Sequence, residues 1–123
     1  DGAYTALIKN GALLQNIIEV PVPGSFELTS GADILLSSVK VDAVICLGCV
    51  IQGETRHFDF ICNAVANGVT NVSIKHSKPV IFGVLTTDNL QQAKDRAGGK
   101  HGNKGEEAAV TAIMMASIKS LLV

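Results

Sequence analysis

Residues 41–62, VDAVICLGCVIQGETRHFDFIC, contain the pattern that decides the fold of this chain. The first half, Val41 to Ile51, is β-branched and almost wholly apolar, as in a central strand of a parallel sheet whose two faces are both covered. The second half has helical spacing, because apolar and small residues recur at intervals of three and four from Ile61 to Val69. We therefore expect a strand that leads through a short loop into a helix from about Phe58 to Lys75.

Helices and strands alternate on both sides of this unit. The expected elements are the end of a helix at Ala3–Ile8, a strand at Ile17–Val22, a helix at Phe26–Val39, a strand at Val80–Leu85, a short helix at Asn89–Ala97 and a final helix to about Leu122. Asn103 and Glu106 are spaced as the N-cap of that last helix and its reciprocal partner. Without a hairpin signal, repeat or linker, the sequence predicts one α/β domain over residues 1–123, with a parallel sheet and right-handed crossovers.

Composition excludes several classes of function. With 123 residues the chain is long enough for one domain and one core. Hydrophobic residues make up 47% and charged residues 17%, so we expect some apolar surface to be buried between subunits. The net charge of −1 argues against general nucleic-acid binding. Apolar runs fall far below the roughly 20 residues of a membrane helix, and no export signal is visible, so we expect a cytoplasmic protein, or a plastid one in a plant.

Cys46 and Cys49 have the C-x-x-C spacing of redox and zinc sites. In a strand, however, residues three apart point to opposite faces, so the two thiols could not bind one metal ion. Neither a second cysteine pair nor a nearby histidine supplies the remaining ligands. We interpret Cys46, Cys49 and Cys62 as reduced, structural thiols.

In parallel sheets, ligands bind beyond the carboxyl ends of the strands, where residues 22–27, 48–57 and 85–89 should meet. Residues 53–58, GETRHF, join the strand to the helix, so their backbone amides can hold an anion such as phosphate. Thr55 could cap the helix or donate to the ligand, and His57 is a usable general base near pH 7. The alternative makes Thr55 an ordinary cap and His57 a surface residue.

Other candidates are less specific. Arg96, Lys100 and Lys104 cluster around glycines before the last helix, where they would suit a phosphorylated ligand, although the loop lacks the Walker pattern and could be a solvated basic loop. Glu27 could accept hydrogen bonds from a polyol or be a first-turn acid. Phe26 and Phe82 could stack on a flat heterocycle or belong to the core.

Together these segments resemble the lumazine synthase family, from Gly2 to about Ile118. Residues 22–28, VPGSFEL, resemble the family's V-P-G-[SA]-F-E-[LI] turn, and residues 48–59, GCVIQGETRHFD, resemble G-x-V-I-x-G-x-T-x-H-[FY]-D. Residues 79–86, PVIFGVLT, and then RAG at 96–98 with GNKG at 102–105 and EAA at 107–109, complete the set in the family's order.

The resemblance implies a three-layer α/β/α flavodoxin-like sandwich that forms pentamers, in many members a sixty-subunit icosahedral shell, with active sites shared between subunits. It implies a transferase of riboflavin biosynthesis without cofactor or metal. This enzyme condenses 5-amino-6-(D-ribitylamino)uracil with 3,4-dihydroxy-2-butanone 4-phosphate to give 6,7-dimethyl-8-ribityllumazine, phosphate and two waters. Association with riboflavin synthase is a further implied partnership.

The family's residue roles carry over onto matching positions. His57 would be the catalytic proton shuttle. The ribityl and pyrimidine pocket would consist of Ser25, Phe26, Glu27, Cys49, Val50, Ile51, Phe82, Lys104 and Glu107. The phosphate would be held by Gly53, Glu54, Thr55 and Arg96, with Arg96 and Phe82 contributed by the neighbouring subunit.

Family members also carry an N-terminal segment with a central strand and a stacking aromatic, which we expect to be missing from this sequence. Two other hypotheses for the function remain. The chain could be a non-catalytic relative that binds flavin or lumazine or forms a shell, or an unrelated phosphosugar enzyme with the same topology.

Overall fold

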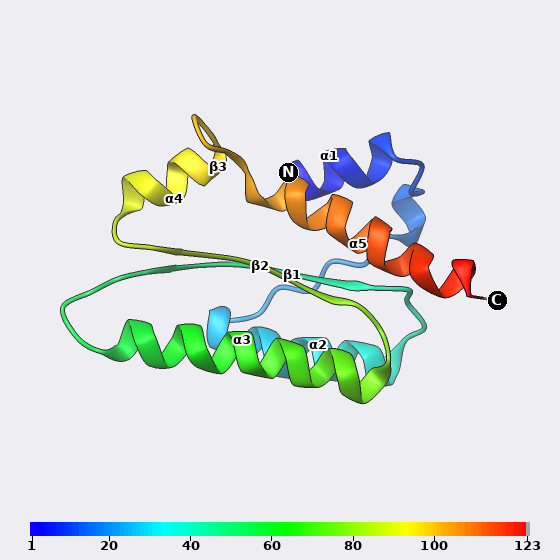
Figure 1. The fold of residues 1–123 in the computed structure, drawn as a ribbon, viewed down its shortest axis with the longest axis horizontal. Helices are drawn as coiled ribbons and strands as arrows, with labels where there is room; N and C mark the ends of the chain where they lie inside the picture. The colour runs from blue at the N-terminus through cyan, green and yellow to red at the C-terminus, as the bar shows by residue number, and fades with distance from the viewer. Residues whose placement is uncertain (123) are drawn as a thin grey trace.

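The computed structural model describes residues 1–122 of the chain (Figure 1). Its elements, in order, are α1 (Gly2–Lys9), the 3₁₀ turns η1 (Leu14–Asn16) and η2 (Ser25–Glu27), α2 (Leu28–Ser38), β1 (Val44–Ile51), α3 (His57–His76), β2 (Val80–Thr87), α4 (Leu90–Arg96), β3 (Ala97–Gly99), β4 (Gly102–Asn103) and α5 (Lys104–Leu121). The expected α/β class is confirmed.

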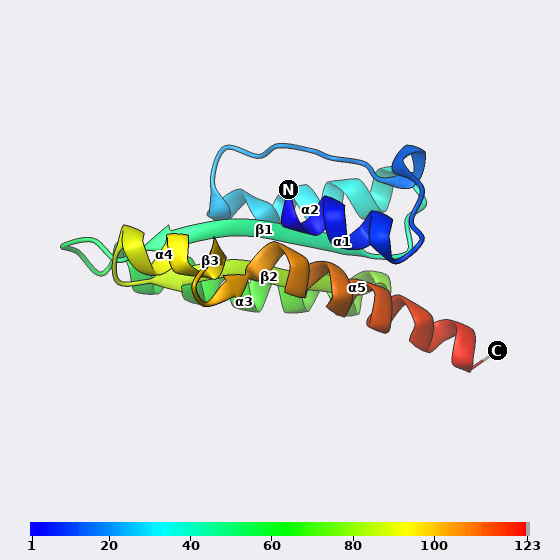
Figure 2. The same ribbon diagram turned by 90° about the horizontal axis from the view of Figure 1, so that it is seen from above.

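A parallel pair of strands forms the central layer. β1 and β2 are in register from Val44 opposite Val80 to Ile51 opposite Thr87. Helices α2 and α3 cover one face of this sheet, and α1, α4 and α5 lie over the other, so the protein has three layers (Figures 1 and 2). Both strands run in the same direction, so their carboxyl ends meet at one edge.

The alternation of β1 side chains assigns each residue to a layer. Val44 and Cys46 are buried against α2 and α3, in a core whose most buried side chain is Val65. On the other face, Ile45 packs near small residues of α1 and α5, where Ala109 is fully buried. The expectation that both faces of this strand are covered is wrong for part of its length. Leu47 is 46% exposed and Ile51 is 40% exposed in the described chain.

The expected strand at Ile17–Val22 does not form. Ile17 has extended backbone angles (φ −101°, ψ 119°), but the segment joins no ladder, because β1 pairs only with β2 among residues 1–122. A strand needs partner groups for its backbone amides and carbonyls. The segment is anchored instead by side chains, including Tyr4, whose hydroxyl donates to Glu19 at 2.9 Å.

A short antiparallel hairpin, β3–β4, is present where no hairpin was expected. Gly98 (φ +106°) and Gly102 (φ +94°) adopt the left-handed conformation that a tight turn requires and that other residues rarely take. After the hairpin, the Asn103 side chain accepts a hydrogen bond from the Glu106 amide at 3.1 Å, which confirms the predicted N-cap. Among the described residues, no helix is both long and apolar enough to cross a membrane.

Candidate active site

The carboxyl ends of β1 and β2 remain paired beyond the strands. The Gln52 amide donates to the Thr87 carbonyl at 2.8 Å, and the exposed loop 52–56 extends from this edge, as Figures 1 and 2 show. A Cβ atom added at Gly53 would meet nothing within 4 Å, so the space above the loop is open. A ligand can therefore approach the backbone here.

His57 is the first residue of α3, and it is exposed. Its amide donates to the Thr55 hydroxyl at 3.3 Å, so Thr55 contacts the start of the helix. Arg56, the N-cap residue, makes no side-chain cap. The first turn of α3 thus offers amides and the positive end of a helix dipole beside an accessible imidazole.

The turn η2 packs against β1 and α3. The Ser25 hydroxyl lies 3.5 Å from the Cys49 carbonyl, and Phe26 is 57% exposed. A Cβ at Gly48 would be 2.6 Å from Ser25 Oγ and 3.1 Å from Leu28 Cδ1, so glycine allows the turn to approach the strand. The structure therefore brings Ser25, Phe26 and Glu27 close to the end of β1, where Cys49, Val50 and Ile51 lie.

A second group of candidates lines a cavity of about 550 Å³ beneath α4 and the hairpin. The predicted residues in it are Arg96, Lys100, Lys104 and Glu107, and its other charged or basic side chains are Asp95 and His101. Lys100 Nζ lies 3.9 Å from Asp95 Oδ2. Sequence reasoning missed Gln92 and Asp95, although residues 92, 95 and 96 have the spacing of a single helical face.

The two groups lie on different sides of the sheet. Residues 25–27 and His57 belong to the side of α2 and α3, whereas Arg96 and Lys104 belong to the side of α4 and α5 (Figure 1). Phe82 pairs in register with Cys46, is 36% exposed and does not line the cavity with Arg96. The single chain therefore holds the candidate residues in two separate groups, which we call half-sites.

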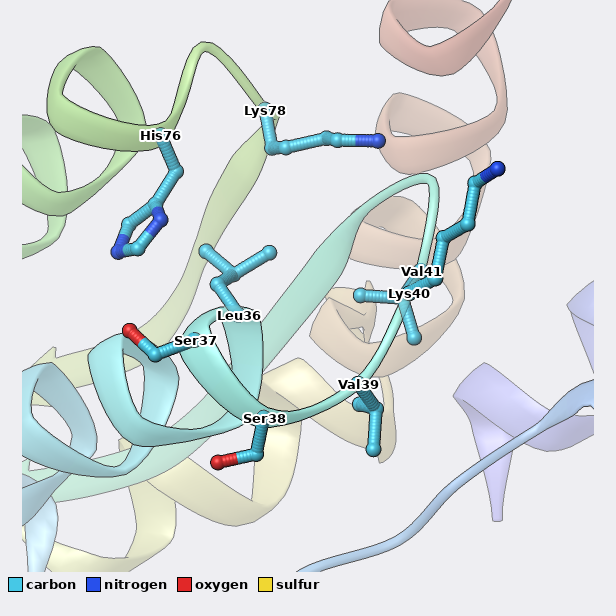
Figure 3. Close-up of a pocket in the computed structure, with 8 residues that line it drawn as sticks. All are labelled: Leu36, Ser37, Ser38, Val39, Lys40, Val41, His76 and Lys78. Carbon is cyan, nitrogen blue, oxygen red and sulfur yellow. The ribbon is translucent and has the colours of Figure 1, made fainter.

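Another cavity, of about 330 Å³, lies at the opposite end of the sheet (Figure 3). His76 and Lys78 line it, but His76 Nε2 is 2.7 Å from Asp33 Oδ1, and Lys75 Nζ is 3.0 Å from the same oxygen. These hydrogen bonds, first from His76 and then from Lys75, lower the pKa of Asp33. Figure 3 shows the Lys40 and Lys78 side chains extending away from Ser38, so these groups do not converge on a ligand.

The cysteines behave as structural thiols. Cys46 is buried and Cys49 exposed, as expected for opposite faces of a strand, and all three cysteines are free. Burial raises the pKa of Cys46 to about 11 and also raises the pKa of Cys49. Within residues 1–122, no group of three or more His, Cys, Asp or Glu side chains is arranged to hold a metal ion.

Comparison with known proteins identifies the family. The model of the 6,7-dimethyl-8-ribityllumazine synthase family matches residues 1–120. Proteins of that name from Cytophaga hutchinsonii and Parabacteroides distasonis are similar to the chain. The first is 67% identical over 115 residues, which are 94% of this chain and 72% of the relative. The second is 52% identical over 120 residues, 98% of this chain and 75% of the relative. The chain belongs to the 6,7-dimethyl-8-ribityllumazine synthase family.

Proposed function

We propose that the protein condenses 5-amino-6-(D-ribitylamino)uracil with 3,4-dihydroxy-2-butanone 4-phosphate to form 6,7-dimethyl-8-ribityllumazine in riboflavin biosynthesis. The amine of the uracil adds to the ketone and water leaves, giving an imine. Phosphate is then eliminated, and the ribityl-bearing nitrogen closes the second ring with loss of another water. Each stage moves a proton, while no step needs an oxidant or reductant.

One observation carries this proposal: an accessible imidazole, His57, lies directly beside an open loop of backbone amides at the carboxyl edge of the sheet. The amides of residues 53–55 and the Thr55 hydroxyl suit a phosphate. His57 suits proton transfer at the carbon chain attached to that phosphate. Holding both substrates in register supplies much of the remaining rate enhancement.

The other predicted residues would complete the pocket from both sides of the sheet. Arg96 would balance the phosphate charge, and Phe82 would cover the heterocycle. The remaining pocket contacts would come from Ser25, Phe26, Glu27, Cys49, Val50, Ile51, Lys104 and Glu107, with Glu54 in the phosphate loop. Glu27 would accept hydrogen bonds from ribityl hydroxyls, because an ionised carboxylate has only acceptor oxygens.

A homo-oligomer would join the two half-sites. The opposite positions of His57 and Arg96 relative to the sheet support a site formed between two copies. Apolar residues of α5 support the same arrangement, since Met114 is 65% exposed and Leu121 is 80% exposed in the described chain. We therefore include a pentamer, and a sixty-subunit icosahedral shell built from pentamers, in the proposal; light scattering of the purified protein distinguishes them.

The test of function is to incubate the full-length protein with both substrates and follow lumazine absorbance and fluorescence. Arg96→Gln should raise the KM of the phosphate-bearing substrate about tenfold or more, as for loss of a charge-assisted hydrogen bond. Lys94→Gln is the matched control, because Lys94 is exposed on the same helix and does not line the cavity. Absence of turnover by the folded wild-type protein would instead favour a non-catalytic lumazine- or flavin-binding relative.

A mixing experiment tests the shared site. His57→Ala and Arg96→Gln subunits are unfolded together in equal amounts and refolded. If each site takes His57 from one copy and Arg96 from the next, about a quarter of the interfaces regain both residues, and activity rises above that of either variant. If both residues act within one chain, mixing restores nothing.

We also propose a cytoplasmic location and an association with riboflavin synthase. The free cysteines suit a reducing compartment. Fractionation of the source cells, followed by co-purification with riboflavin synthase activity, tests both statements.

A further inference from the structure

We propose that His101 is an additional substrate-binding residue of this site, which binds the phosphate group of the four-carbon substrate together with Arg96. The inference rests on the proposed function and adds a residue to which the family resemblance assigned no role. It follows from the position of His101 in the cavity and from the charges around it.

The backbone holds His101 in a defined position. Its amide donates to the Asp95 carbonyl at 2.7 Å, which ties the hairpin between β3 and β4 to the end of α4. A Cβ at Gly99 would lie 2.7 Å from the Lys94 carbonyl oxygen, so the hairpin and helix are in close contact. His101 and Arg96 line the same cavity, and the helix that carries Arg96 also anchors the residue that carries the imidazole.

The charges of the cavity leave a place for one more positive group. Arg96, Lys100 and Lys104 face Asp95 and Glu107, while β2 contributes the uncharged Thr86 and Thr87 and α4 also contributes Gln92. These three cations and two carboxylates give the cavity a net charge of one positive unit. Lys100 is moreover close to Asp95, at 3.9 Å, so the two charges offset one another.

A phosphate monoester carries between one and two negative charges near neutral pH. The surplus of one positive charge therefore leaves a dianion incompletely balanced. A protonated imidazole supplies the missing charge and a directed N–H donor, and charge-assisted hydrogen bonds of this kind are the strong ones. His101 is exposed in the single chain, so its ring can be approached by a phosphate.

The experiment compares His101→Asn and His101→Arg with the wild-type full-length protein. His101→Asn should raise the KM of the phosphate-bearing substrate about tenfold to a hundredfold, as for loss of one charge-assisted hydrogen bond, with kcat and the KM of the pyrimidine nearly unchanged. His76→Asn is the control, because His76 lines the other cavity. Binding of inorganic phosphate, measured by calorimetry, should weaken by a similar factor.

The phosphate affinity of His101→Arg distinguishes a binding role of His101 from a purely structural one. A guanidinium keeps a positive charge and N–H donors at this position. His101→Arg should therefore bind inorganic phosphate at least as tightly as the wild type, whereas a purely structural role of the imidazole would leave His101→Arg as impaired as His101→Asn. Equal loss of phosphate affinity in the two variants, unchanged phosphate binding in His101→Asn, or a fall in kcat alone overturns the proposal.

The calorimetric result separates this inference from the proposed function. Phosphate binding that depends on His101, without lumazine formation by the wild type, would support the residue assignment and refute the reaction. Lumazine formation with equal phosphate affinity in wild type and His101→Asn would support the reaction and refute the role of His101.

Discussion

Replacement of His57 by alanine should slow turnover by about tenfold to a thousandfold without abolishing it. The imidazole moves protons, but the substrates are still held in register by the loop 53–55 and by the Arg96 cavity. Because the two reactants combine spontaneously to some extent, proximity alone retains part of the acceleration. A tenfold to thousandfold loss corresponds to about 1.4 to 4 kcal/mol of transition-state stabilisation.

The structure separates this kinetic effect from folding. His57 is exposed, and within residues 1–122 its imidazole makes no hydrogen bond to the protein. The contact of its backbone amide with Thr55 survives the substitution. The free energy of unfolding should therefore change by no more than about 0.5 kcal/mol, as for other surface positions.

The assay is the initial rate of lumazine fluorescence at saturating concentrations of both substrates, with a reaction lacking enzyme as the baseline. Added imidazole should restore part of the rate in His57→Ala and have little effect on the wild type, because a free imidazole can take the vacated position. A folded variant with the wild-type rate, or one with no rate above the baseline, would refute the role assigned to His57.

Other predictions concern packing and titration. Gly48→Ala should displace η2, since the new Cβ would lie 2.6 Å from Ser25 Oγ, and should raise the KM of the pyrimidine while β1 stays paired, as measured by kinetics and circular dichroism. Val65→Ala should lower the free energy of unfolding by about 1–3 kcal/mol in denaturant titrations, because this side chain is only 1% exposed; the exposed Asn67→Ala on the same helix should change it by less than about 0.5 kcal/mol. Burial raises the pKa of Cys46 from 9.0 to about 11. The unfolded chain therefore releases this proton at lower pH than the folded one, and stability should fall as pH rises from 9.0 toward about 11, a component that Cys46→Ala should remove in melts at several pH values.

The sequence was sufficient to predict those elements whose hydrophobic pattern is regular over many residues. The apolar stretch at residues 41–51 became β1, and the helical spacing after it became α3, with bounds shifted by a few residues. The N-cap at Asn103 was also predictable, because a capping side chain acts within one turn of helix. These signals are local, because the residues that produce each of them lie close together in the sequence.

Signals that depend on distant partners were harder to interpret. The apolar run at Ile17–Val22, interrupted at Glu19, has strand propensity, but a strand forms only where a second strand supplies the ladder. The β3–β4 hairpin was not predicted, because glycines such as Gly98 and Gly102 are equally typical of an irregular loop. The Arg96 cavity was anticipated only in part, since its lining comes from β2, α4, the hairpin and α5, whose juxtaposition follows from tertiary packing.

The separation of the two half-sites has a simple origin in the chain topology. Helix α3 leaves the end of β1 toward one face of the sheet, and α4 leaves the end of β2 toward the other (Figure 1). The loop at His57 and the helix carrying Arg96 therefore begin at the same edge and diverge. Two copies turned relative to each other can oppose one group to the other without any change in backbone, whereas one copy would have to bend a loop around the strand edge. Under the proposed reaction, a substitution that keeps the protein monomeric should leave both half-sites folded and still stop turnover.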